Sequence, residues 1–305
     1  MKILASRRFP GSAWDELDDV EYYERLDGER PAIDALVVVG EVVDDRVLDL
    51  FPRLSLVANY GVGYDAIDVE ACRARGVAVT NTPGVLDAAT ADLTLALILA
   101  SRRRLVEGDA FVRAGRWGSD WVATELLGQE VSGSKLGIVG LGRIGSAVAR
   151  RAHGFDMRLL YTKRERLRAE EEHDLGLEYR ELDDLLAEAD IVTIHVPLSP
   201  ETERLIDARR ISLLRGGACF VNTARGAIVD EPALVEALVA GRIRAGLDVF
   251  ADEPDVPAEL LGLPNVVLTP HVGSATHETR AAMTRVLVDN LLAAEHGEPL
   301  PNRVT

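Results

Sequence analysis

The chain has 305 residues, 47% of them hydrophobic, and its 50 acidic and 34 basic side chains give a net charge of −16. This length and apolar content suffice for two domains with their own cores, and they exclude a disordered chain. The acidic balance argues against nucleic acid or an anionic membrane as a partner.

The N-terminal residues lack the long apolar core of a signal peptide. The longest strongly apolar run, near Leu93 to Ala100, is far shorter than the roughly 20 residues that a membrane-spanning helix needs. We therefore expect a cytoplasmic protein. Cys72 and Cys219 lie far apart and lack the spacing of a metal site, so we expect reduced thiols and no bound metal.

Short apolar segments of β type alternate with helical segments along the chain. The first four candidate strands are Lys2–Ala5, Ala35–Val39, Leu54–Ala58 and Val77–Thr80. Six more follow at Lys135–Val139, Arg158–Tyr161, Asp190–His195, Ala218–Asn222, Ala245–Val249 and Asn265–Leu268. Helical segments between them include Arg143–Ala152, Leu182–Glu188 and Glu231–Ala240. This alternation is typical of parallel sheets covered by helices on both faces.

Two long helices frame the second group of strands. Val85–Arg103 is apolar on nearly all sides between Ala91 and Ala100, which predicts burial of that part. Ala275–His296 is expected to return and pack on the first unit. The predicted fold is α/β, with two doubly wound parallel-sheet domains. Residues 96–276 form a dinucleotide-binding domain inserted into a substrate domain of residues 1–95 plus 277–305. Because such sheets bind ligands at the carboxyl ends of their strands, we expect the active site in a cleft between the two domains.

A glycine-rich turn, Gly140-Leu-Gly-Arg-Ile-Gly145, joins the strand at Lys135–Val139 to a helix. Gly140 permits the tight turn, Gly142 lets the backbone approach a pyrophosphate, and Gly145 allows the helix to pack closely on the sheet. The helix N-terminus adds a positive dipole. Since strand, turn, helix and a following strand are all present, we predict a dinucleotide site rather than a plain glycine turn.

The end of the next strand indicates which dinucleotide binds. An NAD site would place a carboxylate there for the ribose 2′-hydroxyl, but the residues are Leu160-Tyr-Thr162. Lys163 and Arg164 follow and would neutralise a 2′-phosphate, which favours NADP(H). Two alternatives stay open. The two cations are ordinary solvated charges, or Glu165 reaches a ribose and the cofactor is NAD(H).

Several further motifs come in a fixed order. Before the glycine turn stand Gly61-Val-Gly-Tyr-Asp-Ala-Ile-Asp68 and Asn81-Thr-Pro-Gly84. After it come His195-Val-Pro-Leu198, Val221-Asn-Thr-Ala-Arg-Gly226, Gly246-Leu-Asp-Val-Phe-Ala-Asp-Glu-Pro254 and Thr269-Pro-His-Val-Gly-Ser274. In this order and spacing the chain, from about Leu54 to Arg280, resembles the D-2-hydroxyacid dehydrogenases. Residues 59–68 and 81–92 resemble the glyoxylate and hydroxypyruvate reductase branch.

The resemblance implies a Rossmann nucleotide domain, a flavodoxin-like substrate domain and a homodimer formed through the nucleotide domains. It also implies an oxidoreductase that transfers hydride between NADP(H) or NAD(H) and a small 2-oxo or 2-hydroxy acid. A non-catalytic dinucleotide sensor of the same fold, similar to the corepressors of this superfamily, is the alternative. Turnover of glyoxylate, hydroxypyruvate or pyruvate distinguishes the two.

The resemblance assigns catalysis to Arg225, Glu253 and His271. His271 would protonate the alkoxide, since imidazole titrates near neutral pH. Glu253 would bond the other ring nitrogen and favour the protonated ring, and Arg225 would polarise the carbonyl and bind the carboxylate. Singly, such residues are usually loop, turn or surface residues, but their combination favours catalysis. His195 is expected to be structural or to line the cofactor.

The remaining assignments also follow from the resemblance. The backbone N–H groups of Val62 and Gly63 would bind the substrate carboxylate, with a plain glycine turn as the alternative. Asp248 would accept a hydrogen bond from the nicotinamide carboxamide, unless it caps a helix or turn. Trp117 or Trp121 would reach the partner subunit's active site, or lie at a dimer interface or on the surface. The other expected cofactor contacts are Arg143, Ile144, Thr162, Pro197, Thr202, Thr223 and Ala224.

Overall fold

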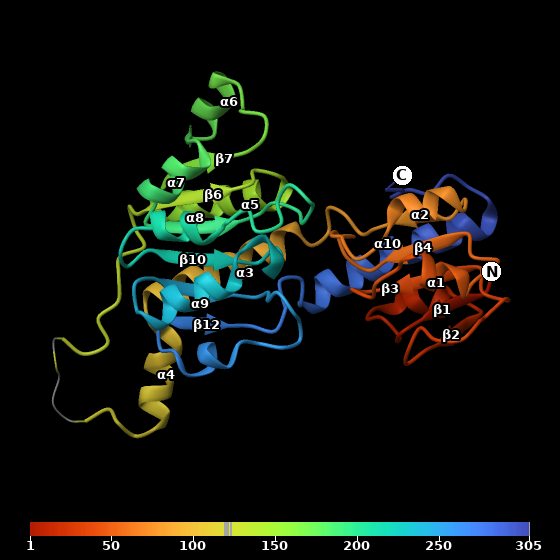
Figure 1. Cartoon of the computed structure of the whole chain (residues 1–305), viewed down its shortest axis with the longest axis horizontal. Coiled ribbons are helices and arrows are strands. Elements are labelled where there is room, and N and C mark those ends of the chain that lie inside the picture. Colours follow the sequence, from red (N-terminus) through yellow and green to blue (C-terminus); the bar gives the residue numbers. More distant parts are fainter. Residues whose placement is uncertain (119–121, 123, 305) are drawn as a thin grey trace. The chain divides into compact units, whose positions relative to one another are not determined.

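The computed structural model describes residues 1–118, 122 and 124–304, and the chain divides into two compact units (Figure 1). Unit 1 comprises Met1–Leu86 and Ser274–Thr305, and unit 2 comprises Asp87–Gly273. Both are parallel α/β units, which confirms the predicted fold class. Among the described residues, no helix is both long and apolar enough to cross a membrane.

Unit 1 is built on a five-stranded parallel sheet in the order β2-β1-β3-β4-β5, the flavodoxin-like order. The interior strands β1, β3 and β4 are buried along their whole length, which explains why their sequence is apolar as far as Asn59. The strands are β1 (Ile3–Ala5), β2 (Val20–Tyr22), β3 (Ala35–Val38), β4 (Leu56–Asn59) and β5 (Ala78–Thr80).

The helices of unit 1 include the last long helix of the chain. This helix, α10, packs against η1 and β4, so the chain does return to its first unit. Thr276 caps its start by accepting a hydrogen bond from the Thr279 N–H at 3.1 Å, and Gly297 ends it with φ of 68°. The helical elements are η1 (Ser12–Glu16), α1 (Asp45–Asp49), α2 (Val69–Ala74) and α10 (His277–His296).

Unit 2 has a seven-stranded parallel sheet in the order β12-β11-β10-β9-β6-β7-β8, which is the Rossmann arrangement. Its strands are β6 (Lys135–Val139), β7 (Arg158–Thr162), β8 (Leu177–Tyr179), β9 (Ile191–Ile194), β10 (Cys219–Asn222), β11 (Arg244–Leu247) and β12 (Val266–Leu268). Its helices are α3 (Asp87–Arg102), α4 (Leu105–Arg113), α5 (Arg143–Ala152), α6 (Ala169–Asp174), α7 (Leu182–Glu188), α8 (Ala208–Leu213) and α9 (Glu231–Val239), with short 3-10 turns η2 (His153–Phe155), η3 (Gly226–Ile228) and η4 (Ala258–Gly262).

The helix α3 belongs wholly to unit 2, because it packs on α5, β10 and β11. Its Leu97 lies so close to Gly246 that a Cβ on the glycine would be 2.8 Å from the Leu97 Cβ. The domain boundary that the sequence suggested at 95/96 would cut this helix, whereas the compact units divide at 86/87 and 273/274. Burial of α3 is not complete all round as predicted, since Asp92 and Ala96 are exposed.

Two strands, β2 and β8, escaped the sequence analysis. Both are edge strands of three residues with a central glutamate, and both are partly exposed. Edge strands bury little, so they lack the apolar pattern of the interior strands.

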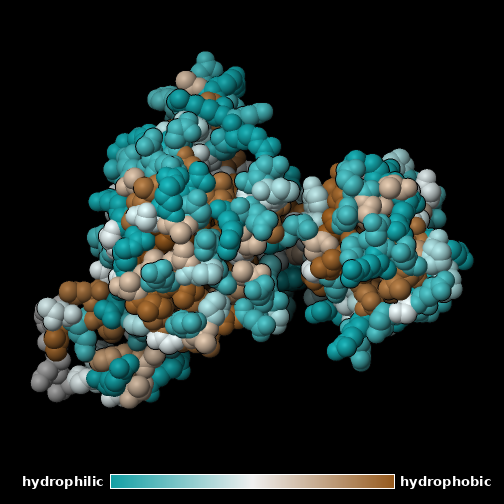
Figure 2. Space-filling model, in the orientation of Figure 1, coloured by the Kyte–Doolittle hydropathy of each residue, from teal (hydrophilic) through white to brown (hydrophobic). Residues whose placement is uncertain are grey.

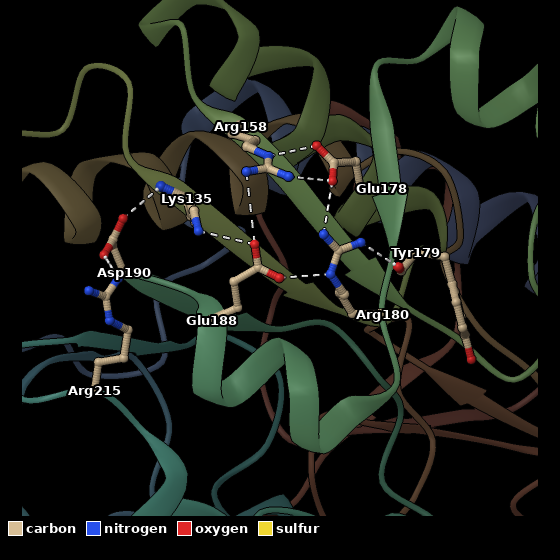
Figure 3. Close-up of polar contacts among 8 residues, drawn as sticks. All are labelled: Lys135, Arg158, Glu178, Tyr179, Arg180, Glu188, Asp190 and Arg215. Carbon is tan, nitrogen blue, oxygen red and sulfur yellow. Dashed lines mark hydrogen bonds and ion pairs between the residues drawn. The ribbon is translucent and has the colours of Figure 1, made fainter.

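An ion-pair network joins β6, β7, β8 and α7 (Figure 3). Arg158 Nε and a terminal nitrogen lie 2.6 and 2.7 Å from the two oxygens of Glu178. Glu188 accepts from Lys135 Nζ at 3.1 Å and from Arg180 Nε at 2.7 Å. These side chains are partly exposed, so each pair stabilises the sheet only modestly.

Candidate active site

The glycine turn between β6 and α5 is shaped by steric contact at two of its three glycines. Gly140 has φ of 96°, and a Cβ there would lie 2.5 Å from the His195 carbonyl oxygen. A Cβ on Gly145 would lie 2.1 Å from the Gly140 carbonyl oxygen. Gly142 differs, because a Cβ there would meet nothing within 4 Å. The protein therefore leaves this side of the turn open, as a backbone that approaches a phosphate requires.

The N-terminus of α5 adds donors to this turn. Its N-cap residue is Gly142, and no side chain caps the helix, so the first N–H groups, at Arg143 and Ile144, have no side-chain acceptor. Uncapped N–H groups and the helix dipole suit a pyrophosphate. The turn is tied to the end of β7, since the Gly140 N–H donates to the Thr162 carbonyl at 2.9 Å. The residues present therefore fit a dinucleotide.

Two cations that are not held in ion pairs follow immediately after β7, with Glu171 and Glu201 as their more distant acidic neighbours. Within the part of the chain that the structure describes, the side chains of Lys163 and Arg164 make no hydrogen bond or ion pair. The next cation is different, because Arg166 contacts both oxygens of Glu172 at 2.8 Å. Glu165 is exposed. An anionic group at this strand end would therefore meet two cations whose hydrogen-bond donors are not engaged by a carboxylate.

The loop after β9 is held by Thr202. Its hydroxyl donates to the Pro197 carbonyl at 2.6 Å and accepts from the Ser199 N–H at 2.8 Å. His195 begins the loop, and its Nε2 lies 2.9 Å from the Thr193 hydroxyl. Burial lowers the pKa of His195 to about 3. A ring that stays neutral is unsuited to act as a general acid, so His195 has a structural or lining position.

Glu253 and His271 are brought together although 18 positions separate them in the chain. Nδ1 of His271 lies 2.7 Å from Oε2 of Glu253, whose Oε1 accepts from the Phe250 N–H at 3.0 Å. Burial raises the pKa of Glu253, but the hydrogen bonds from His271 and Phe250 and the charge of Arg225 outweigh burial and hold that pKa below its usual value. The carboxylate is therefore ionised, and it directs the Nδ1 proton toward itself and leaves Nε2 for another partner.

Asp248 shapes the turn that carries His271. His271 has φ of 52°, a left-handed conformation that costs about 1 kcal/mol or more in a residue with a side chain. The Asp248 carbonyl accepts from the His271 N–H at 2.8 Å, and its carboxylate accepts from the Val272 and Gly273 N–H groups at 2.8 Å and from the Thr269 hydroxyl at 2.6 Å. Burial raises the pKa of Asp248, and these hydrogen bonds oppose the rise.

This geometry bears on the role that the family resemblance gave to Asp248. The side chain is 0% exposed and both of its oxygens already accept hydrogen bonds. The structure thus places it beneath the His271 turn, as the turn-capping alternative implies. Contact with a nicotinamide carboxamide stays a prediction.

Arg225 lies on the turn after β10, which Asn222 holds in shape. The Asn222 side chain accepts from the Ala224 N–H at 3.0 Å and donates to the Arg225 carbonyl at 2.8 Å. Arg225 itself donates to the Ala224 carbonyl at 2.7 Å. A Cβ on Gly226 would lie 2.0 Å from the Phe250 carbonyl carbon. The Arg225 turn therefore rests directly on the segment that leads to Glu253.

The backbone of Ala224 is accordingly engaged within the protein, and Thr223 is 9% exposed with its hydroxyl 3.0 Å from that of Thr94. Cofactor contacts through these two residues stay a prediction. Asn222 was missed by sequence reasoning. An asparagine directly after a buried strand was the available signal, because its side chain readily bonds a turn two or three residues on.

In unit 1, two asparagines shape the loop after β4. Asn59 Nδ2 donates to the Gly61 and Gly63 carbonyls at 3.1 and 2.8 Å, and Asn81 Nδ2 donates to the Val62 carbonyl at 2.9 Å. The carbonyls of this loop are thus occupied. Among the described residues, the N–H groups of Val62 and Gly63 have no acceptor. Such a pair of free N–H groups is suited to bind a carboxylate.

The two tryptophans differ in what the structure shows. Trp117 is 71% exposed, which agrees with a surface or interface position. Trp121 lies outside the described residues. Contact of either tryptophan with the active site of a partner subunit therefore stays a prediction.

The Rossmann sheet, the open glycine turn and the carboxylate–imidazole pair are the features of an NAD(P)-dependent dehydrogenase. Residues 95–273 match the family model described as D-isomer specific 2-hydroxyacid dehydrogenase, NAD binding domain. The chain is 47% identical to a glyoxylate reductase of Pyrococcus furiosus, over 99% of this chain and 90% of the relative. It is 50% identical to that of Thermococcus kodakarensis, over 89% and 83%.

Solved structures agree. A protein from Thermus thermophilus has a TM-score of 0.91 and 44% identity, with all of both chains covered. An NADPH-dependent glyoxylate/hydroxypyruvate reductase from Sinorhizobium meliloti, in complex with NADP and malonate, has a TM-score of 0.89 and 36% identity, covering 100% of this chain and 96% of that one. The chain belongs to the D-isomer specific 2-hydroxyacid dehydrogenase family, as its motifs indicated, and is an NAD(P)-dependent oxidoreductase.

Proposed function

We propose that this protein reduces glyoxylate or hydroxypyruvate and prefers NADPH to NADH. The single observation that carries the catalytic part is the 2.7 Å contact between His271 Nδ1 and Glu253 Oε2, on the unit that holds the open glycine turn. The names of the relatives, which are glyoxylate reductases, support the substrate. The charges of Lys163 and Arg164, which form no hydrogen bond or ion pair among the described residues, support the cofactor preference.

The reaction needs a hydride, a proton and a charged anchor for the substrate. Bound NADPH supplies the hydride to the carbonyl carbon. The N–H groups of Val62 and Gly63 bind the substrate carboxylate, and the Arg225 guanidinium polarises the carbonyl oxygen. His271 donates the Nε2 proton to the oxygen as negative charge develops there. Glu253 stabilises the protonated ring before transfer and holds its orientation.

Replacing His271 by alanine tests the acid. We expect loss of turnover in an assay that follows NADPH absorbance with glyoxylate, hydroxypyruvate and pyruvate. NADPH affinity, measured by fluorescence titration, should stay nearly unchanged, because the glycine turn lies elsewhere on the sheet. Loss of NADPH binding would instead make His271 structural. A wild-type protein that binds NADPH tightly but turns over none of these 2-oxo acids would favour the dinucleotide-sensor alternative.

Replacing both Lys163 and Arg164 by glutamine tests the cofactor preference. A 2′-phosphate would lose two charge-assisted contacts, so we expect KM for NADPH to rise by about tenfold or more. KM for NADH should change little. The control is Arg150→Gln, which removes an exposed cation from the far end of α5. An equal rise for both cofactors would refute the assignment of these cations.

We also propose a homodimer formed through unit 2. None of the residues of helix α4 is buried. Its apolar side chains Leu105, Val106 and Val112 are 55%, 55% and 53% exposed. Beside it lies a groove of about 450 Å³, whose lining is mostly aliphatic, including Leu261 and Val266, but also contains Arg104 and Glu107. Figure 2 shows apolar surface gathered on this part of the unit. Covering such a surface is favourable.

Light scattering tests the dimer. We expect twice the 33.1 kDa mass of the chain. A glutamate in place of Val106 would put a charge into the covered surface and should yield monomers. A wild-type protein that is monomeric at micromolar concentration would refute the proposal.

A further inference from the structure

Below the segment that carries Lys163 and Arg164 lies a buried polar cluster with no part in the proposed chemistry. Tyr161, on β7, is 0% exposed. Its hydroxyl donates to Glu172 Oε1 at 2.7 Å and accepts from the Leu167 N–H at 2.9 Å. A buried phenol with both hydrogen-bonding functions satisfied holds its partners in one geometry.

The cluster continues through Glu172 on α6 to Arg166. Glu172 is only 9% exposed and binds the Arg166 guanidinium through both oxygens, each at 2.8 Å. The Arg166 guanidinium carbon also lies 5.1 Å from the centre of the Tyr179 ring, and that ring packs edge-on against Tyr161 at 5.6 Å. The guanidinium, whose side chain is 59% exposed, is thus held by a carboxylate and contacts the face of an aromatic ring.

The charge state of this cluster does not change in the working pH range. The Arg166 guanidinium and the Tyr161 hydroxyl hold the pKa of Glu172 at about 2, and burial beside Glu172 raises the pKa of Tyr161 to about 12. The carboxylate therefore compensates Arg166 fully. Arg166 adds no free charge to the strand end, in contrast to its neighbours Lys163 and Arg164.

The segment after β7 is thereby fastened at both ends. At its start, the Thr162 carbonyl accepts from the Gly140 N–H of the glycine turn at 2.9 Å. At its far end, Arg166 and Leu167 are bound by Glu172 and the Tyr161 hydroxyl. Only Lys163, Arg164 and Glu165 lie between these anchors, so the backbone that carries the two free cations has little freedom.

We propose that Tyr161, Glu172 and Arg166 form a clamp that positions Lys163 and Arg164, and that this clamp determines selectivity for NADPH over NADH. The three are positioning residues, which act through the two cations rather than on the cofactor. The inference rests on the proposed preference for NADPH. Its distinctive consequence is that a neutral change in a buried phenol, which touches no phosphate, alters discrimination between two cofactors that differ by one phosphate.

The test is Tyr161→Phe, which removes one oxygen and keeps the ring, the volume and the net charge. We expect KM for NADPH to rise about fivefold, since two hydrogen bonds that hold the segment are lost. KM for NADH and kcat with either cofactor should change by less than about twofold, because a contact to the 2′-phosphate is made equally in ground and transition states. A purely structural role would affect both cofactors alike.

A double-mutant cycle separates this inference from the cofactor preference itself. In a Lys163→Gln, Arg164→Gln background the cations are absent, so adding Tyr161→Phe should cause no further change in KM for NADPH. If the background variant does not lower NADPH preference, the proposed preference fails and the clamp fails with it. If the background variant lowers it but Tyr161→Phe alone does not, only the clamp is refuted.

Glu178→Gln is the matched control for stability. Glu178 binds Arg158 at the other end of β7, through contacts of 2.6 and 2.7 Å. Its loss should lower the unfolding midpoint while the ratio of the two KM values stays that of the wild type. A Tyr161→Phe effect that persists in full without the two cations, or one that raises both KM values equally, would overturn the clamp.

Discussion

Replacing Gly226 by alanine tests whether contact between two turns positions Arg225 and Glu253, the proposed catalytic groups. Gly226 follows Arg225, and Phe250 begins the segment that leads to Glu253. An added Cβ would lie 2.0 Å from the Phe250 carbonyl carbon, 2.2 Å from its oxygen and 2.3 Å from the Ala251 nitrogen. All three are backbone atoms, so no side-chain rotation relieves the overlap.

The size of the effect follows from these distances. Non-bonded carbons approach to about 3.5 Å, so the two turns must separate by about 1.5 Å. Overpacking of this kind costs about 1–3 kcal/mol, and we expect the upper end because backbone must move. A displacement of about 1 Å in a catalytic group lowers the rate about 100-fold. We therefore expect kcat/KM to fall by about 100-fold or more.

Urea unfolding and the NADPH absorbance assay measure the two effects. The control is Gly216→Ala, where an added Cβ meets nothing within 4 Å and φ is not positive. That variant should change the free energy of unfolding by less than about 0.5 kcal/mol and leave turnover intact. Wild-type activity in Gly226→Ala would show that the close contact between the two turns is not needed to position Arg225 and Glu253. The reasoning from this contact would then be wrong.

Two further substitutions test individual carboxylates. Glu253→Gln keeps the shape of the side chain but removes the charge that stabilises a protonated His271, so kcat should fall by about 10²–10⁴. A kcat equal to that of the wild type in this variant would contradict the pairing. Arg158 hydrogen bonds hold the pKa of Glu178 at about 2, below its ordinary 4.5. Glu178→Gln should therefore lower the free energy of unfolding by about 1 kcal/mol above pH 5, a modest value because the pair is partly exposed. In chemical unfolding measured against pH, this difference should vanish as pH falls from 4.5 to about 2; a constant difference would refute it.

The interior strands of both sheets could be predicted within one or two residues. Strands such as β4 and β9 are buried on both faces, and continuous apolar sequence is the direct result. The edge strands β2 and β8 could not, because a three-residue strand with a central glutamate has no burial pattern to detect. The long α3 was predicted, but the domain boundary was placed inside it rather than at its start, since apolar sequence does not say which unit a helix packs on.

The candidate site likewise contains features that the sequence predicts and features that it does not. The glycine turn could be read from local sequence, because its requirements are steric and lie within six residues. The prediction that Glu253 pairs with His271 rested on family resemblance, since no sequence periodicity connects residues in loops that follow different strands. The roles of Asn59 and Asn222 in holding the loops were missed, and that of Asp248 was named only as the alternative to a cofactor contact. Their hydrogen-bond partners depend on backbone directions that exist only after the sheet forms.

The sequence by itself determined two α/β units, the glycine turn predicted to bind phosphate, and the two adjacent cations after β7, because each depends on neighbouring residues. Tertiary structure decided the rest. Tertiary packing brings His271 Nδ1 within 2.7 Å of Glu253 Oε2, bonds Asp248 to the left-handed turn of His271, and joins Tyr161 to Glu172 next to the segment of Lys163 and Arg164. These are contacts between segments distant in the chain, and their geometry is defined by packing rather than by local conformational preference.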